Sequence, residues 1–256
     1  MADNKLPVVV VHGVGSGKNK DRAGFSRELS SNVHEVVRPV IRLGPYETVK
    51  NASEVDPKDG IFWQEALWES VNDVTDDAFK AFAKAQFLNT PVAWLSSALF
   101  DIVSDVPLYL GVNGEEIRRV VKEIILQHPN CVLVGHSLGS VISADILREG
   151  QQTDNFSNMP VSAFITIGSP LNLLKMRNPM DRPFPFVWDN FYYPKNPIAV
   201  NGNLSEAVFP GVRNHTLSAG ETFAVSHTSY WSSTVLAFAV YSMSYGGRGM
   251  KSYEIV

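Results

Sequence analysis

The stretch Cys131-Val-Leu-Val-Gly-His-Ser-Leu-Gly-Ser140 decides the fold class of this chain. Its first four residues are apolar and suited to a buried strand, and they lead directly into a Gly-x-Ser-x-Gly motif. Apolar residues with helical spacing follow over 141–148. The pattern therefore predicts a strand, a sharp turn and a helix, with Ser137 at the apex of the turn.

The two glycines of this motif have a steric explanation. A tight strand-to-helix turn strains the backbone of the serine and brings neighbouring backbone segments close together. Side chains two residues before and after the serine would collide there, and Gly135 and Gly139 occupy these positions. The hydroxyl of Ser137 would then project from the end of the sheet, within reach of a base and of a substrate carbonyl. An ordinary Gly/Ser turn at a strand end is the alternative interpretation.

Length and composition allow a single large α/β domain. The chain has 256 residues, of which 45% are hydrophobic, enough to build a full core without disulfides or metals. The net charge is -4 and no Lys/Arg run exceeds two residues, which disfavours nucleic acid and anionic membranes as partners. We therefore expect a small-molecule substrate, and the oligomeric state stays open.

Cysteine content and the amino-terminal residues favour a cytoplasmic protein. Cys131 is the only cysteine, so no intrachain disulfide can form, and its strand position predicts a buried core residue. Residues 1–7 lack a signal-peptide pattern, and the most apolar windows, 92–103 and 235–241, are too short for a membrane span. Because no His/Asp/Glu cluster has ligand spacing, we expect no metal and no cofactor.

A glycine-rich turn also follows the first predicted strand. Residues 8–11 are four valines, typical of a strand buried on both faces, and residues 12–18 read His-Gly-Val-Gly-Ser-Gly-Lys. A phosphate-binding loop would need a glycine where this chain has His12, and a Ser or Thr where it has Asn19. The spacing therefore disfavours nucleotide binding.

An oxyanion hole is the favoured interpretation of this turn. A glycine after the strand lets the chain bend, so that the amide of Val14 points into the space above the sheet. The amide of Leu138, directly after the serine, would supply the second donor. A plain strand-to-helix turn is the alternative.

The two motifs, residues 8–15 and 135–139, together resemble the α/β-hydrolase fold and are most similar to its small lipases and esterases. The resemblance implies a mostly parallel central sheet of about six strands flanked by helices, without the amino-terminal strand pair of larger members. It also implies that the catalytic residues follow the chain order serine, acid, histidine.

Hydrophobic periodicity predicts the elements outside these motifs. The expected helices are 21–36 and 113–128, the second opening with a capping-box pattern, and the expected strands are 36–43, 161–167, 186–193 and 212–217. Within the single domain 1–256, residues 46–112 are expected to form a helical insertion, with apolar residues at helical spacing near 62–71, 79–87 and 95–106. These helices would either cap the site and line an acyl pocket or pack beside the sheet.

His227 is the predicted catalytic base. Of the six histidines, only His215 and His227 follow Ser137. His215 lies inside a predicted strand, which favours a structural role. His227 lies in a loop before an apolar helix, and its Ser-His-Thr-Ser-Tyr-Trp run is similar to the His-Ser-x-Tyr-Trp run of lipase-like members.

The acid position departs from the family pattern. Similar members carry Asp-Pro-Val or Asp-x-Ile-Val after the penultimate strand, and the matching position here is Asn196. An asparagine carbonyl can orient the imidazole but brings no charge to it. Asn196 would then be a neutral orienter in a slow enzyme, which we favour. Otherwise Asp189, Glu206 or Glu221 reaches the histidine, or the protein binds esters without turnover.

The sequence thus predicts a serine hydrolase that cleaves a carboxylic ester or a lipid-like acyl substrate through an acyl-enzyme on Ser137. His227 would exchange the proton, Asn196 would orient His227, and the amides of Val14 and Leu138 would hold the oxyanion. The alternative is a weak or inactive hydrolase-fold protein that binds its ligand. Substrate chain length, headgroup and the choice between esterase and acyltransferase stay open.

Overall fold

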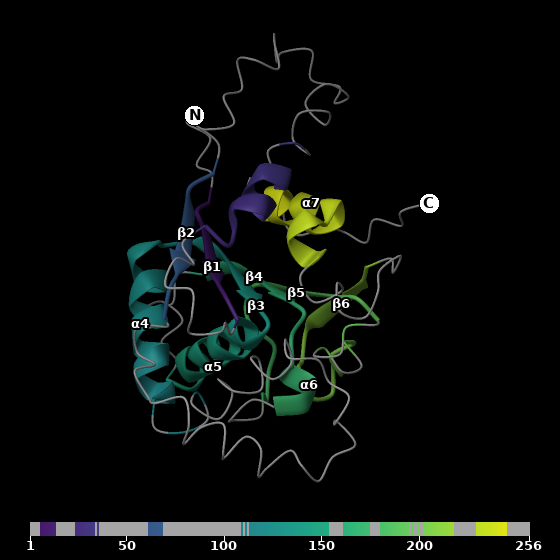
Figure 1. Cartoon of the computed structure of the whole chain (residues 1–256). Helices are drawn as coiled ribbons and strands as arrows, with labels where there is room; N and C mark the ends of the chain where they lie inside the picture. The colour runs from purple at the N-terminus through teal and green to yellow at the C-terminus, as the bar shows by residue number, and fades with distance from the viewer. Residues whose placement is uncertain are drawn as a thin grey trace, which may run out of the picture.

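The structure of the chain is a computed structural model that describes residues 6–13, 24–33, 35, 61–68, 109, 111, 113–153, 161–174, 180–194, 196, 199, 202–217 and 229–244. Within them, six strands form one all-parallel sheet in the order β2-β1-β3-β4-β5-β6 (Figure 1). The strands are β1 (Val8–Val11), β2 (Trp63–Ala66), β3 (Cys131–His136), β4 (Val161–Ile167), β5 (Val187–Tyr192) and β6 (Val212–Thr216).

Helices cover both faces of this sheet. The described helices are α4 (Gly114–Gln127), α5 (Leu138–Gln152), α6 (Leu171–Leu174), the 3-10 turn η4 (Ser229–Ser232) and α7 (Thr234–Ser244), together with helical residues 27–33. Side chains of α4 and α5 share one core with the sheet, and side chains of α7 and of residues 27–33 share the other. In Figure 1, α4 and α5 accordingly lie on the opposite side of the sheet from α7. The fold is therefore a three-layer α/β structure.

The alternation of side chains in β1 explains why the strand is a run of valines. Val9 and Val11 pack into the core of α4 and α5, whereas Val8 and Val10 pack into the core of α7. All four side chains are fully buried. A central parallel strand that is covered on both faces has no place for a polar residue, as the sequence predicted.

The chain reverses its direction of travel across the sheet between β1 and β3. It runs from β1 to β2, at the edge of the sheet formed by the described strands, returns to β3 on the other side of β1, and then moves outward through β6. Parallel α/β sheets bind ligands beyond the carboxyl ends of their strands at such a point. The register pairs Val11 with Gly135, so Gly13 and Ser137 both follow at this edge.

Most elements of the sheet agree with the sequence. The predicted strands around residues 131–134, 161–167, 186–193 and 212–217 correspond to β3 to β6. The predicted capping box of α4 is wrong, because Asn113 makes no side-chain capping hydrogen bond and Glu116 pairs instead with Arg119 at 2.6 Å.

The expected helix around residues 62–71 is also wrong where the structure describes it. Trp63–Ala66 forms the edge strand β2, which pairs with β1. Four residues carry too little period-two alternation to outweigh apolar residues at helical spacing, and pairing with β1 decides the outcome. Phe62 and Leu67 flank the strand and are 58% and 41% exposed. The predicted strand 36–43 and most of 46–112 lie outside the described residues.

Candidate active site

The turn between β3 and α5 consists of one residue. β3 ends at His136 and α5 begins at Leu138, so Ser137 alone reverses the chain. Its backbone has φ 52° and ψ −127°, a conformation that costs a non-glycine residue about 1–3 kcal/mol. The strained serine at the apex of a sharp turn, predicted from the sequence, is therefore confirmed.

Three glycines make this turn possible. A Cβ atom on Gly135 would lie 2.6 Å from the Cα of Ser140, and one on Gly139 would lie 2.2 Å from the carbonyl oxygen of Val11. A Cβ atom on Gly13 would lie 2.5 Å from the Cβ of Ser137. The motif glycines thus have the predicted steric role, and Gly13 brings the loop after β1 into contact with the serine.

The hydroxyl of Ser137 is buried and unsatisfied in the part of the chain that the structure describes. The residue is 1% exposed, and its Oγ has no hydrogen-bond partner among the described residues. A buried polar group without a partner costs about 1–3 kcal/mol, so proteins keep one mainly where function requires it. Together with the strained backbone, this hydroxyl makes Ser137 the leading candidate for a reactive group.

The amino terminus of α5 lies directly at Ser137. Leu138 is the first residue of this 15-residue helix, so its amide has no partner within the helix. The positive end of the helix dipole also lies there and favours negative charge. Val14, the second predicted oxyanion donor, lies outside the described residues, although its neighbour Gly13 contacts Ser137.

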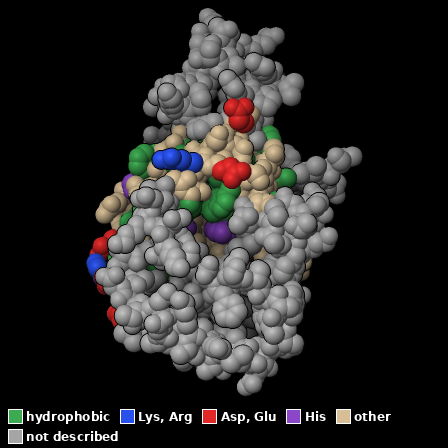
Figure 2. All heavy atoms as spheres, viewed as in Figure 1, with side chains coloured by type: hydrophobic (Ala, Val, Ile, Leu, Met, Phe, Trp, Pro, Cys, Tyr) green, Lys and Arg blue, Asp and Glu red, His purple; other side chains and the backbone are tan. Residues whose placement is uncertain are grey.

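Aromatic rings surround the two turns. His12 stacks on Trp68 with ring centroids 5.3 Å apart and meets the edge of Phe25 at 5.0 Å. His136 lies 4.8 Å from Trp231, and Phe25 lies 5.9 Å from Trp231. Figure 2 shows a histidine beside hydrophobic side chains on one face of the molecule. Five residues, His12, Phe25, Trp68, His136 and Trp231, here called the aromatic arc, thus place aromatic rings around the elbow, which the sequence did not predict.

Asn196 is buried beside a tyrosine that the sequence analysis missed. Its Nδ2 donates to the hydroxyl oxygen of Tyr230 at 2.8 Å, and the amide of Tyr193 donates to the same oxygen at 3.1 Å. The amide of Ala199 approaches Asn196 Oδ1 at 3.5 Å. Burial raises the pKa of Tyr230 to about 12, so the hydroxyl stays neutral at physiological pH. In this arrangement Asn196 Nδ2 faces Tyr230 and Oδ1 faces the Ala199 amide.

His227, the predicted base, lies outside the described residues. The turn that follows it, η4, packs against the elbow, because Trp231 contacts the ring of His136. Tyr193 Oη also donates to the carbonyl oxygen of Ser229 at 3.5 Å. Tyr230 and Trp231 in η4 therefore lie close to Asn196 and to the elbow, respectively.

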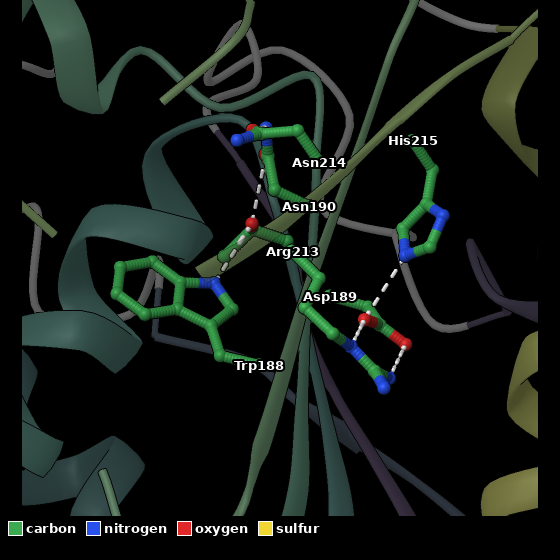
Figure 3. Close-up of polar contacts among 7 residues, drawn as sticks. Trp188, Asp189, Asn190, Arg213, Asn214 and His215 are labelled. Carbon is green, nitrogen blue, oxygen red and sulfur yellow. Dashed lines mark hydrogen bonds and ion pairs between the residues drawn. The ribbon is translucent and has the colours of Figure 1, made fainter. Parts of the chain in front are cut away.

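Asp189, one of the alternative acids, is committed to other partners (Figure 3). Its two carboxylate oxygens accept from Arg213 Nε at 2.6 Å and Arg213 Nη2 at 2.7 Å, and Nε2 of His215 lies 3.0 Å away. The Asp189 side chain is fully buried. Glu206 is exposed in a turn, and Glu221 lies outside the described residues.

His215 is too far from Ser137 to act as its base. The register aligns His136, Ile167, Phe191 and His215 in one row across four adjacent strands. Three strand spacings amount to about 14 Å, far beyond a hydrogen bond. The predicted structural role of His215 agrees with this distance and with its contact to Asp189.

The sequence matches no protein-family model and no curated protein. Among the described residues, no group of three or more His, Cys, Asp or Glu side chains could hold a metal ion. None of the helices within the described ranges is long and apolar enough to cross a membrane.

Proposed function

We propose that this protein is a serine hydrolase of the α/β-hydrolase type that cleaves a carboxylic ester or a lipid-like acyl substrate. The observation that carries the proposal is Ser137, whose strained backbone and buried hydroxyl lie at the amino terminus of α5. The strand order supports it, because Ser137 lies at the carboxyl end of β3, where the chain reverses direction beside β1.

In the proposed reaction, Ser137 Oγ attacks the carbonyl carbon of the ester and its proton passes to His227. The carbonyl electron pair moves onto oxygen, and the amides of Leu138 and Val14 stabilise the negative charge. The bond to the alcohol oxygen then breaks, and His227 returns the proton to the leaving alcohol. Water attacks the acyl-enzyme by the same sequence and releases the carboxylic acid.

Chain connectivity supports His227 as the base. His227 precedes Ser229, the first residue of η4, by two residues in the sequence. The turn η4, which Ser229 begins, packs on His136, the residue directly before the predicted nucleophile. His215, the other histidine after Ser137, is separated from it by three strand spacings.

The orientation of Asn196 supports its role as a neutral orienter. Because Nδ2 donates to Tyr230, the Asn196 carbonyl oxygen faces the Ala199 amide, which approaches it at 3.5 Å. A carbonyl oxygen has two lone pairs, and in the proposed mechanism the second would accept from an imidazole N–H. An amide in this position orients the histidine and favours one tautomer, but it does not stabilise an imidazolium charge. We therefore expect slow turnover.

The aromatic arc supports an apolar acyl group. Phe25 and Trp231 lie between the rings of His12 and His136 and are only partly buried. Partly exposed apolar surface beside a reactive serine favours apolar substrate groups because their burial releases water. A short polar ester would not use this surface.

Hydrolysis of p-nitrophenyl esters from acetyl to decanoyl tests the proposal, with Ser137→Ala as the control. We expect slow release of nitrophenol by the wild type, with kcat/KM rising with chain length, and no release above background by the variant. Equal rates for the two proteins would refute the proposal.

Asn196 also motivates a second candidate function, an ester-binding protein without turnover. That candidate predicts saturable binding of a decanoyl ester by the wild type and no turnover by either the wild type or Asn196→Asp. Turnover by either protein would exclude it.

A further inference from the structure

We infer that Ser140 and Ser169 are positioning residues, which aim the Leu138 amide at the oxyanion. The inference rests on the proposed function, in which this amide is an oxyanion donor. It assigns a role to two buried hydroxyl groups, one on α5 and one two residues after β4, that the proposed mechanism does not otherwise use.

The first link of this arrangement is the carbonyl oxygen of Ser137. It accepts from the backbone amide of Ser140 at 2.9 Å and from the Ser140 hydroxyl at 2.5 Å. Ser140 is fully buried, so water does not compete for its hydroxyl. The carbonyl is thus held by two donors of one residue.

The second link is Ser169, which directs the proton of Ser140. The two hydroxyl oxygens are 2.7 Å apart. A hydroxyl has one proton, and a carbonyl oxygen can only accept, so Ser140 donates to Ser137 and accepts from Ser169. The amide of Leu171 donates in turn to Ser169 Oγ at 3.3 Å. The donors form a chain that ends on the Ser137 carbonyl.

Peptide geometry connects this carbonyl to the oxyanion donor. The carbonyl of Ser137 and the amide of Leu138 belong to one planar, trans peptide unit, in which C=O and N–H point in opposite directions. Donors that fix the direction of the C=O therefore also fix the direction of the Leu138 N–H. Hydrogen bonds to the carbonyl polarise the unit as well and make its N–H a stronger donor.

Ser169 also ties this peptide to β4. It follows Ile167 and Gly168 at the carboxyl end of that strand, and the carbonyl of Ile167 accepts from the amide of Ser137 at 3.0 Å. The neighbouring strand therefore holds the elbow on both sides of the serine. A strained turn needs such external contacts to keep one conformation.

Comparison of an ester with its thionoester tests the inference. The substrates are p-nitrophenyl acetate and the analogue in which sulfur replaces the carbonyl oxygen, because sulfur is a weak hydrogen-bond acceptor and gains less from an oxyanion donor. We expect Ser140→Ala to lower kcat/KM for the ester about tenfold, with little change in KM, and to affect the thionoester much less. Equal losses for both substrates would overturn the inference.

Two further variants sharpen this comparison. The ratio of kcat/KM for the ester to kcat/KM for the thionoester should fall less in Ser169→Ala than in Ser140→Ala. Because Ser169 acts through Ser140, the double variant should lower this ratio no further than Ser140→Ala alone. The matched control is Ser143→Ala, one turn further along α5. Ser143 is equally buried, and its Oγ has no hydrogen-bond partner among the described residues, so the ratio should not change. An additive double variant would overturn the proposed order.

A readout that needs no turnover separates this inference from the proposed function. The ¹⁵N resonance of Leu138 reports hydrogen bonding at the Ser137 carbonyl, and we expect it to shift in Ser140→Ala but not in Ser143→Ala. An unchanged resonance would overturn the inference even if esters are hydrolysed. A shifted resonance in a protein whose wild type hydrolyses no ester would overturn the proposed function and the catalytic role, but not the peptide geometry.

Discussion

Two regions of the molecule carry the residue types of a catalytic triad, and their physical states are opposite. In the β5–β6 charge cluster, formed by Asp189, Arg213 and His215, the Asp189 carboxylate lies within 3.0 Å of nitrogen atoms of both other side chains. The elbow has a serine in a strained conformation, with no partner for its hydroxyl among the described residues. Of these two regions, the elbow is the one that carries a free-energy cost, and a catalytic role would explain that cost.

The two regions also differ in where they lie in the sheet. Asp189 and Arg213 pair directly across two strands, at the third residue of β5 and the second of β6. Ser137 lies beyond the end of β3, where the chain reverses its direction across the sheet. An aspartate and a histidine in contact are therefore weaker support for a catalytic site than a strained, unsatisfied serine at this edge.

The largest expected effect concerns the β5–β6 charge cluster. Asp189→Asn should lower the free energy of unfolding by about 3 kcal/mol, because it leaves the Arg213 charge without its buried partner. Because Arg213 is partly exposed, the loss lies at the low end of the range for breaking a buried ion pair. Urea denaturation measures it, with the exposed Glu206→Gln as a control expected within about 0.5 kcal/mol of the wild type.

Ester hydrolysis by Asp189→Asn, measured where the variant is folded, should equal that of the wild type. Lost turnover with unchanged stability would instead assign Asp189 to the catalytic machinery and remove the contrast between the two regions.

The next effect concerns Asn196. Asn196→Asp should raise kcat about ten- to a hundredfold, because a carboxylate stabilises the imidazolium that an amide does not. Tyr230 can accommodate the change, since its hydroxyl can donate to a carboxylate where it now accepts from Nδ2. The matched variant Asp189→Asn should show no gain. If Asn196→Asp were slower than the wild type, residue 196 would not be the group that orients a catalytic histidine.

The smallest effect isolates the strain at the elbow. Ser137→Gly should be more stable than Ser137→Ala by about 1 kcal/mol, because glycine adopts a positive φ without steric cost. The same pair at Ser143 should give the opposite sign by a similar amount, about 1 kcal/mol, because glycine weakens a helix interior. Chemical denaturation of the four variants measures both differences. The same sign at the two positions would mean that the elbow carries no strain.

Sequence alone was sufficient for the elbow and for most of the sheet. The glycine spacing around Ser137 and the valines of β1 reflect local sterics and burial on both faces, which a sequence records directly. The strand β2 could not be predicted, because its four residues gain their stability from pairing with β1. Its Glu65 accepts from the amide and hydroxyl of Ser26, at 2.8 and 2.6 Å, a contact between residues 39 apart.

The surroundings of the candidate site could not be predicted from the sequence either. Tyr230 and the aromatic arc reach the elbow from segments far apart in the chain, and no local pattern marks such meetings. His227 and Val14 lie outside the described residues, so their roles remain predictions.

Labelling with a fluorophosphonate, followed by intact mass and peptide mapping, tests the central claim most directly. The reagent reacts with an activated serine whatever the natural substrate is. We predict one adduct per chain, located on Ser137, and none in Ser137→Ala. A wild type without an adduct, or an adduct that persists in Ser137→Ala, would contradict the assignment of Ser137 as a nucleophile.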